Sequence, residues 1–193
     1  NCKILVVTSM EVYGKSNSYN TPIKENSVFN PNNPYGASKA SQDLLSQAYF
    51  NGHQLNVVRV RPLNHIGPRQ SDQFVATAFA RQLARIEFGL QEPTIMVGNL
   101  SASRDFTDVR DMVKAYTLAM EHGRPGMAYN ISSGNSYTIQ EILDILISLT
   151  KINISIEIDP KRVRSSSTPA LKADCAEFNR IANWCPEITI EQT

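Results

Sequence analysis

Two segments rich in β-branched residues constrain the fold of this chain more than any other feature. Residues 3–9 read KILVVTS, which is apolar on both faces, and residues 55–62 read LNVVRVRP. Both are typical of strands buried in a parallel sheet, where helices cover the two faces. A helical pattern lies between them, so the order strand, helix, strand predicts a right-handed crossover between parallel strands.

The helix between these strands is expected to begin after Asn33, which can cap it, with Pro34 at the first position. Its expected end is Asn51-Gly52. The apolar residues along it form one broad face: Ala37, Ala40, Leu44, Leu45, Ala48 and Tyr49. Such a face is explained either by core packing within one chain or by contact with a second copy.

Strand and helix patterns continue to alternate to the end of the chain, which predicts the α/β class. The segment between Ser9 and Asn33 is rich in Ser, Asn and Pro and is interpreted as a loop. Thr138 and Glu141 have the spacing of a capping box. The further expected elements are helix 74–89, strand 94–97, helix 109–122 capped by Asp108, strand 127–132, a helix after Thr138, strand 154–158 and helix 176–182.

Composition excludes several classes of protein. With 19 basic and 18 acidic residues the net charge is +1, so no nucleic-acid or membrane-surface partner is indicated. The apolar run Ile4-Leu5-Val6-Val7 is too short to span a bilayer. Cys2, Cys175 and Cys185 are an odd number without CxxC spacing, which indicates neither disulfides nor a zinc site. We therefore expect a cytoplasmic protein without a bound metal.

Tyr35 and Lys39 are four residues apart on the predicted helix, so their side chains can lie close together. A neighbouring positive charge lowers the pKa of a phenol and makes it usable as an acid or base. A hydroxyl at the end of an adjacent parallel strand, such as that of Ser9, could hold a substrate carbonyl against it. The spacing alone is equally compatible with an ordinary exposed helix face.

Blocks of residues in a fixed order decide between these alternatives. They read TSMEVYG at 8–14, NPYGASKA at 33–40, VRVRPLNHIGPRQ at 58–70 and GNLSASRDFTDVRDMVKAY at 98–116. In this order they resemble the extended short-chain dehydrogenase/reductase family that acts on nucleotide sugars, and most of all its reductases of GDP-linked 4-keto-6-deoxy-mannose. The resemblance implies the C-terminal part of a Rossmann-type parallel sheet plus a smaller α/β substrate-binding domain. Residues 1–70 would be a partial dinucleotide-binding domain, and residues 71–193 mainly the substrate domain with some segments returning to the sheet.

The resemblance also implies an active site. Ser9, Tyr35 and Lys39 match the catalytic serine and the Tyr-x-x-x-Lys pair, whereas Tyr13 matches a structural position. NAD or NADP would supply hydride to the C4 ketone of the sugar, Tyr35 would supply the proton, and Ser9 would polarise the ketone. Lys39 would hold the nicotinamide ribose. Pro62 and Leu63 are implied to contact the cofactor together with Tyr35 and Lys39.

A GDP-linked sugar requires positive charge and hydrogen-bond donors at its diphosphate. Arg104 and Asn64 match family residues that contact the diphosphate, although Arg104 could instead form an ion pair with Asp105 or Asp108. Arg164 resembles a second diphosphate arginine. The family usually has an aspartate at the position of Ser167, which weakens that match.

Further candidates are more ambiguous. Arg81 is a possible substrate residue, but a solvated surface arginine is an equal alternative. Glu11 stands where the related GDP-mannose 4,6-dehydratases have a proton-transferring glutamate, so a dehydratase, or another nucleotide-sugar epimerase or dehydratase, is the competing function. A structural role is favoured for His65, and capping or helix packing for Asp108 and Asp111.

The glycine-rich Gly-x-x-Gly-x-x-Gly turn that cradles a dinucleotide is not found in the 193 residues. Gly123 and Gly126 have only its first spacing. We therefore expect a fragment that lacks the N-terminal part of the Rossmann domain and is inactive alone, with a non-catalytic sugar-nucleotide-binding module as a further alternative. Family members commonly dimerise through the helix that carries Tyr35, which implies a homodimer.

Overall fold

The computed structural model describes residues 2–14, 21–163 and 171–193. The chain forms two compact units. The first consists of Asn1–His65, Asp105–Asn135 and Leu171–Thr193, and the second of Ile66–Arg104 and Ser136–Ala170. Three short strands, β3 (Asn64–Ile66), β5 (Ser103–Asp108) and β7 (Ser136–Thr138), stand at or next to the positions where the chain passes from one unit to the other. The expected division into residues 1–70 and 71–193 stays a prediction.

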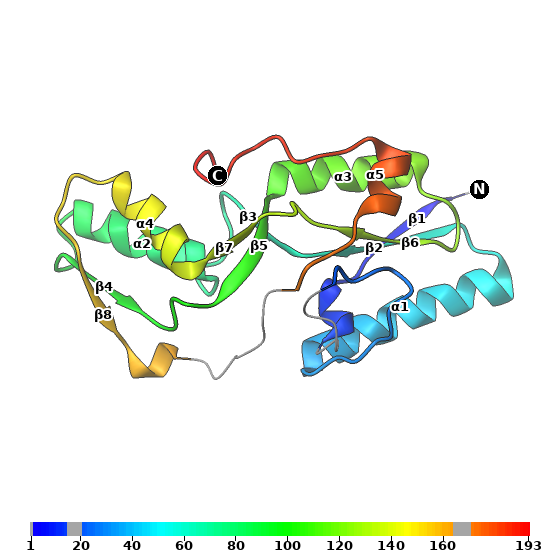
Figure 1. The fold of residues 1–193 in the computed structure, drawn as a ribbon, viewed down its shortest axis with the longest axis horizontal. Coiled ribbons are helices and arrows are strands. Elements are labelled where there is room, and N and C mark those ends of the chain that lie inside the picture. The colour runs from blue at the N-terminus through cyan, green and yellow to red at the C-terminus, as the bar shows by residue number, and fades with distance from the viewer. Residues whose placement is uncertain (1, 15–20, 164–170) are drawn as a thin grey trace. The chain divides into compact units, whose positions relative to one another are not determined.

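The first unit contains a parallel sheet in the order β1-β2-β6. Its strands are β1 (Ile4–Val7), β2 (Val57–Pro62) and β6 (Ala128–Ile131). Figure 1 shows α1 (Pro34–His53) on one face of this sheet, and α3 (Val109–His122) and α5 (Ala176–Ala182) on the other. The expected α/β class with a parallel sheet is therefore confirmed, and β1, α1 and β2 follow one another as predicted.

The first strand is less buried than its composition, which is typical of a sheet interior, would suggest. Ile4 is 40% exposed and the other residues of β1 are only partly buried. The reason is that β1 pairs along one edge with β2, and no strand among residues 2–14, 21–163 and 171–193 pairs with its other edge. An apolar strand with the composition of a sheet interior thus lies at an edge, where its unpaired backbone groups can accept a further strand.

Helix α1 begins as predicted and ends later than predicted. Asn33 caps it, because its Oδ1 atom accepts a hydrogen bond of 2.7 Å from the Gly36 N–H. The expected end at Asn51-Gly52 is wrong, since the helix continues to His53 and the left-handed residue is Gln54, at φ 54°. Glycine also adopts helical angles, and the backbone N–H of Gln54 closes the helix on the Phe50 carbonyl at 2.9 Å.

Much of the apolar face of α1 is open to solvent. Ala40 is buried in the core cluster that includes Met10, whereas Leu44 and Leu45 are 60% and 59% exposed and Tyr49 is also exposed. Core packing within the chain therefore does not explain these three side chains, so that alternative is wrong for them.

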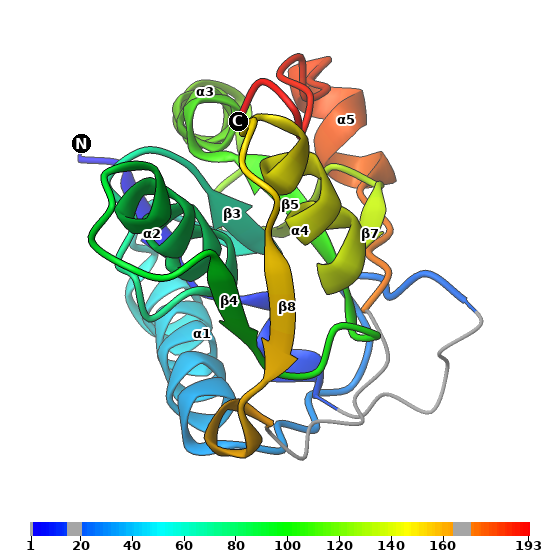
Figure 2. The same ribbon diagram turned by 90° about the vertical axis from the view of Figure 1, so that its left-hand side faces the viewer.

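The second unit contains α2 (Val75–Glu87), α4 (Ile139–Ser148) and the parallel pair β4 (Thr94–Val97) and β8 (Ser155–Ile158). Figure 2 shows β4 and β8 side by side, next to the two helices. Thr138 and Glu141 form the expected capping box at the start of α4, with hydrogen bonds in both directions. The predicted elements of this unit are thus confirmed within a few residues.

Several short elements were not predicted. Residues 10–13, expected to be loop, form a 3-10 helix, η1 (Met10–Tyr13), and a second one is η2 (Pro160–Arg162). The strands β3, β5 and β7 were also missed. Their residues carry no long apolar period, and such short strands exist only because a partner strand supplies hydrogen bonds.

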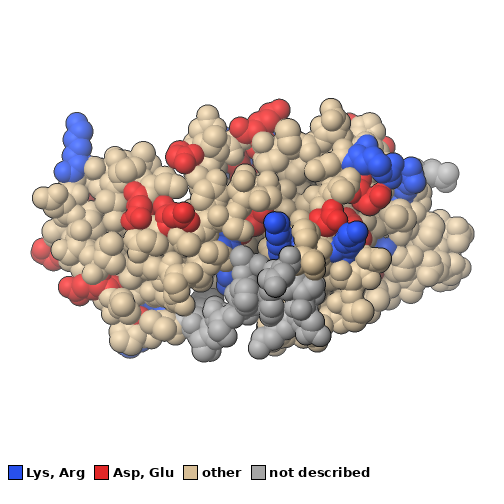
Figure 3. Space-filling model, in the orientation of Figure 1, with Lys and Arg blue, Asp and Glu red and all other residues tan. Residues whose placement is uncertain are grey.

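The surface agrees with the composition. On the face shown in Figure 3, basic side chains occur singly or in small groups between acidic ones, without a broad patch of one sign among the described residues. The part of the chain that the structure describes has no helix that is long and apolar enough to cross a membrane.

Gly36 permits the close approach of α1 to η1, and this approach can be tested. A Cβ atom on Gly36 would lie 2.7 Å from the Glu11 carbonyl oxygen, whereas one on Gly52 of the same helix would have nothing within 4 Å. We expect Gly36→Ala to lower the free energy of unfolding by about 1 to 3 kcal/mol. Gly52→Ala should raise it by about 0.5 kcal/mol, because alanine favours helix. Urea unfolding followed by circular dichroism measures both, and equal effects of the two variants would contradict the close approach.

Candidate active site

Tyr35 and Lys39 lie in the first turns of α1, at the end of β1. The Lys39 Nζ atom lies 5.9 Å from the centroid of the Tyr35 ring. The same Nζ donates a hydrogen bond of 3.1 Å to the carbonyl oxygen of Val7, the last residue of β1. Tyr35 itself is 54% exposed. The ammonium group therefore lies near the tyrosine ring, as the spacing predicted, and it also contacts the carboxyl end of the strand, which the spacing did not predict.

Ser9 follows the same strand end and is buried. Its Oγ atom accepts a hydrogen bond of 3.1 Å from the Glu11 N–H and so caps η1. This bond uses the oxygen as an acceptor, which leaves the hydroxyl hydrogen chemically able to donate to a ligand. Only Thr8 lies between Ser9 and Val7, the residue that Lys39 contacts.

Glu11 is joined to the beginning of α1. Its Oε2 atom accepts a hydrogen bond of 3.0 Å from Asn33 Nδ2, while Asn33 Oδ1 caps the helix at Gly36. The sequence indicated the capping role of Asn33 but not this second contact. The candidate glutamate is thus held beside the helical turn that carries Tyr35.

The residues at the end of β2 lie on the same side of the sheet as Ser9, the side of the carboxyl ends of the strands, because β1 and β2 are parallel. Pro62 is the last residue of β2, and the Leu63 N–H donates to the Ile131 carbonyl at 2.9 Å. The Leu63 side chain is buried in a core cluster that includes Met10. Asn64 is exposed, and its Nδ2 atom donates to the Asp105 carbonyl at 3.3 Å.

The alternative ion pairs proposed for Arg104 do not form. The Asp105 carboxylate accepts hydrogen bonds from Ser133 and Gly134, and that of Asp108 pairs with Arg110 at 2.8 Å. Arg104 Nη1 donates to the Ser103 carbonyl at 2.6 Å. Its assignment to a diphosphate therefore stays a prediction, with the competing carboxylates engaged elsewhere.

The remaining arginine candidates differ in status. Arg81 forms an ion pair with Asp72, and its side chain is 61% exposed, which agrees with the surface alternative. Arg164 and Ser167 lie outside the described residues. The first unit therefore carries Ser9, Glu11, Tyr35, Lys39, Pro62, Leu63 and Asn64, and the second unit carries Arg81 and Arg104.

The acidic residues of α3 have the structural roles that were expected. Asp108 caps the helix at the Arg110 N–H, with a distance of 2.7 Å. Asp111 is fully buried and accepts hydrogen bonds of 2.8 Å from the N–H groups of Glu187 and Ile188. Within the described ranges no group of three or more His, Cys, Asp or Glu side chains is arranged to hold a metal ion. His65 Nδ1 lies 3.4 Å from the Leu63 carbonyl oxygen.

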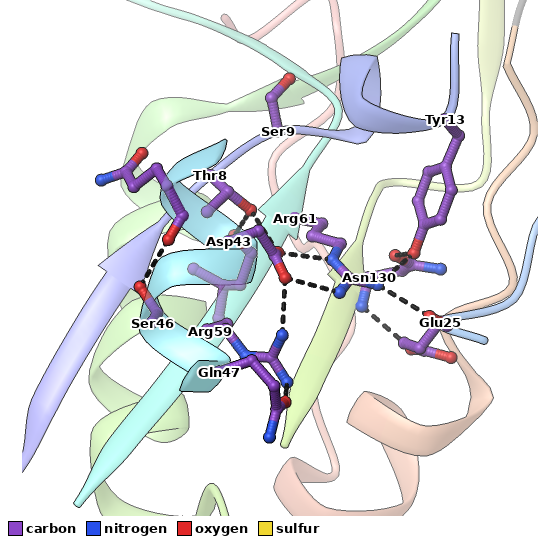
Figure 4. A network of polar contacts seen from close by, with 12 residues as sticks. Thr8, Ser9, Tyr13, Glu25, Asp43, Ser46, Gln47, Arg59, Arg61 and Asn130 are labelled. Carbon is purple, nitrogen blue, oxygen red and sulfur yellow. Dashed lines mark hydrogen bonds and ion pairs between the residues drawn. The ribbon is translucent and has the colours of Figure 1, made fainter. Parts of the chain in front are cut away.

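A buried polar network underlies this site, and sequence reasoning missed it. Figure 4 shows Arg59 and Arg61 of β2 converging on Asp43 of α1, with Thr8 beside them. Arg61 also donates to the Tyr13 hydroxyl at 2.5 Å. The signal in the sequence was weak: an acid four residues after Lys39, and two arginines at alternate positions of VRVRP.

Burial and charge shift the pKa values of two groups in this network, Tyr13 and Asp43. Burial raises the pKa of the Tyr13 phenol to about 12, although Arg61 opposes this shift. Tyr13 is therefore an unsuitable acid or base near neutral pH, in agreement with its expected structural role. Burial also acts to raise the pKa of the Asp43 carboxyl, but hydrogen bonds and charge from Arg61 and Arg59 outweigh it and hold that pKa below its ordinary value. Asp43 is accordingly ionised inside the protein.

A parallel α/β sheet, a serine at the end of a strand and a Tyr-x-x-x-Lys helix beside it define the class of the extended short-chain dehydrogenase/reductases. Residues 1–193 match the family described as GDP-mannose 4,6 dehydratase, and the chain belongs to that family. The resemblance inferred from the sequence blocks is thereby confirmed.

Two curated relatives illustrate the range of the family. The chain is 36% identical over 189 residues to GDP-6-deoxy-D-mannose reductase of Pseudomonas aeruginosa, covering 98% of this chain and 62% of the relative. It is 30% identical over 186 residues to GDP-mannose 4,6 dehydratase 1 of Arabidopsis thaliana, covering 95% of this chain and 50% of the relative. The chain thus spans between half and two thirds of the length of these proteins.

Solved structures show the same fold. A structure of RMD from Pseudomonas aeruginosa complexed with NADPH has a TM-score of 0.91 at 36% identity, over 97% of this chain and 62% of that one. dTDP-glucose 4,6-dehydratase from Bacillus anthracis in complex with NAD has a TM-score of 0.80 at 28% identity, over 98% and 58% of the two chains. A nicotinamide cofactor is therefore common to these neighbours, in both its phosphorylated and unphosphorylated forms.

Proposed function

We propose that the protein carrying this chain is an NAD(P)-dependent reductase of a GDP-linked 4-keto-6-deoxy sugar, converting GDP-4-keto-6-deoxy-mannose to GDP-rhamnose. The observation that carries the proposal is the position of the Lys39 ammonium, between the Tyr35 ring and the last carbonyl of β1. The similarity to GDP-6-deoxy-D-mannose reductase supports it, as does the reductase-like block RPLNHIGPRQ.

The residues of the first unit suit one end of a nicotinamide nucleotide. A reduced nicotinamide, when bound, supplies a hydride to the carbonyl carbon. Lys39 would hold the ribose hydroxyls, since its ammonium has three donors and only some are used by Val7 and Gln42. The backbone at Pro62 and Leu63 lies at the carboxyl-terminal end of the parallel strands, as does this ammonium. NADPH is the form proposed for the reductase.

Proton transfer in this proposal is the task of Tyr35. Its phenol is exposed and can donate a proton to the carbonyl oxygen as the alcohol forms. The Ser9 hydroxyl, whose oxygen already accepts from Glu11, would donate to the same carbonyl oxygen and stabilise the developing charge. Asn64, Arg104 and Arg164 are proposed to bind the GDP diphosphate.

The competing proposal is a GDP-mannose 4,6-dehydratase, and Glu11 is the observation that favours it. Its carboxylate is fixed by Asn33 beside the turn of Tyr35, which is compatible with proton movement during elimination of water. Two assays separate the two reactions. A reductase oxidises NADPH when it is given the 4-keto-6-deoxy sugar nucleotide, whereas a dehydratase converts GDP-mannose without net cofactor oxidation.

The assignment of Tyr35 makes a direct prediction for the complete natural protein that contains this chain. Tyr35→Phe should lower kcat for NADPH oxidation by at least about 100-fold, because the proton donor is removed. The Kd for GDP, measured by titration calorimetry, should change less than about threefold. Tyr129→Phe is the matched control, because Tyr129 is a core residue of β6 and should keep nearly full activity. A Tyr35→Phe enzyme with the kcat of the natural protein would refute the assignment.

The 193-residue chain by itself is proposed to have no turnover. It lacks the glycine-rich turn in its sequence, and β1 has an open edge within the described residues. We expect calorimetry on the purified chain to detect GDP-linked sugar binding without NADPH binding. NADPH-dependent turnover by this chain alone would overturn the proposal. A complete natural protein that binds sugar nucleotide yet turns over neither substrate would instead support the non-catalytic alternative.

A homodimer formed through α1 is the proposed partnership. Leu44, Leu45 and Tyr49 are exposed on this helix. Without a partner their apolar surface would stay in contact with water. We expect the natural protein to have a dimeric mass by light scattering, and Leu45→Glu to reduce that mass by half. Phe88→Glu, at an exposed apolar residue of the second unit, is the control and should leave the mass unchanged. A monomeric natural protein would exclude this partnership.

A cytoplasmic location is also proposed. The three cysteines of the chain are free thiols, two of them exposed, which suits a reducing compartment.

A further inference from the structure

We propose that Asp43 is a positioning residue of the active site: it clamps α1 to β2 and to the segment around Ser9, and so sets where Tyr35 and Lys39 stand relative to that serine. The inference rests on the proposed function of the site. It concerns a residue that the sequence did not indicate, and it gives the buried network a role in the reaction.

The row of residues on α1 gives the first reason. Tyr35, Lys39, Asp43 and Gln47 follow one another at intervals of four, so each side chain is only about 40° further round the helix than the one before. The row begins exposed at Tyr35 and becomes fully buried at Asp43. One helix face thus carries the candidate acid, the candidate cofactor lysine and then the buried carboxylate.

The contacts of the carboxylate give the second reason, because they leave it little freedom. Oδ1 accepts from Arg59 Nη1 at 2.6 Å and from Arg61 Nη2 at 2.9 Å. Oδ2 accepts from Arg61 Nε at 2.8 Å and lies 3.2 Å from the Thr8 hydroxyl. The Arg61 contact is bidentate, a geometry that fixes orientation as well as distance. Arg59 also contacts Gln47, one helical turn further along α1.

The clamp reaches the serine segment from both sides, which is the third reason. Thr8 directly precedes Ser9, and its hydroxyl lies against both Asp43 and the Val60 carbonyl of β2. Tyr13 is in η1, the short helix that Ser9 caps, and its hydroxyl accepts from Arg61. The same hydroxyl donates to Asn130 Oδ1 of β6 at 3.0 Å. The network therefore joins the residues on either side of Ser9 to the helix that carries Tyr35.

The charges of Arg59 and Arg61 fix the position of the Asp43 carboxylate. Arg59 and Arg61 are both buried, and Asp43 is the carboxylate whose oxygens they share. Moving α1 along or around its axis would separate the carboxylate from two buried guanidinium groups, which is strongly unfavourable. Since small misplacements of catalytic groups reduce rates steeply, an anchor of this kind affects turnover more than substrate binding.

The test uses the complete natural protein and compares two buried aspartates. Asp43→Asn is expected to lower kcat for NADPH oxidation at least tenfold, with KM for the sugar nucleotide changed less than about threefold. Asp111→Asn makes the same chemical change at a carboxylate of α3 that is equally buried but holds Glu187 and Ile188 instead. It should keep at least half of kcat when both variants are measured well below their unfolding temperatures.

A second, milder variant tests the inference even if Asp43→Asn does not fold. Thr8→Val keeps the side-chain volume and both arginine contacts but removes the hydroxyl between Asp43 and β2. It should lower kcat at least threefold at unchanged KM. If Asp43→Asn does not fold, Thr8→Val decides by the same criterion. A folded Asp43→Asn enzyme with the kcat of the natural protein overturns the inference, and so does an equal loss of kcat in Asp111→Asn.

Hydrogen exchange provides a readout that does not depend on the reaction. The amides of residues 36–43 should exchange at least tenfold faster in Asp43→Asn than in the natural protein, and should not change in Asp111→Asn. If the natural protein catalyses neither reduction nor dehydration, the proposed function fails, and exchange alone then decides whether Asp43 positions the helix. Unchanged exchange in residues 36–43 of Asp43→Asn overturns the inference in that case.

Discussion

The ionised carboxylate of Asp43, shared by Arg59 and Arg61, is the interaction on which the first unit depends. It joins α1 to the central strand β2 inside the protein, where a separated charge would be strongly unfavourable. The candidate catalytic residues lie on segments that contact this network. Helix α1 carries Tyr35 and Lys39, and Thr8, which Asp43 also contacts, precedes Ser9 at the end of β1. A solvent-exposed ion pair would not provide this constraint, because water weakens it to a fraction of the energy.

The direction of the parallel strands determines where the candidates of the first unit at the end of β2 lie. Parallel strands direct their carboxyl ends to one side, so Ser9 after β1 and the segment from Pro62 to Asn64 at the end of β2 share that side. Membership of the GDP-mannose 4,6 dehydratase family agrees with this arrangement, and relatives include both a reductase and dehydratases. Glu11, the candidate for the competing dehydratase reaction, accepts a hydrogen bond from Asn33 at the start of α1.

Features set by neighbouring residues along the chain were predictable. The caps at Asn33, Asp108 and Thr138 follow from side chains that bond the first backbone N–H groups of their own helix. Features set by distant residues were not. Strand β3 and helix η1 have no periodic pattern of their own, and the exposure of β1 depends on which strand stands beside it. The resemblance named Ser9, Tyr35 and Lys39, but neither resemblance nor pattern indicated that Asp43 is fully buried between two arginines.

By itself, the sequence determined the α/β class, the order of the major helices and strands and the family, since these depend on local periodicity, caps and ordered blocks of residues. Only the tertiary structure decided which side chains meet: Lys39 with the Val7 carbonyl, Glu11 with Asn33, and Asp43 with Arg59 and Arg61. The physical reason is that these partners are brought together by strand pairing and helix packing, whose geometry no short stretch of the chain contains.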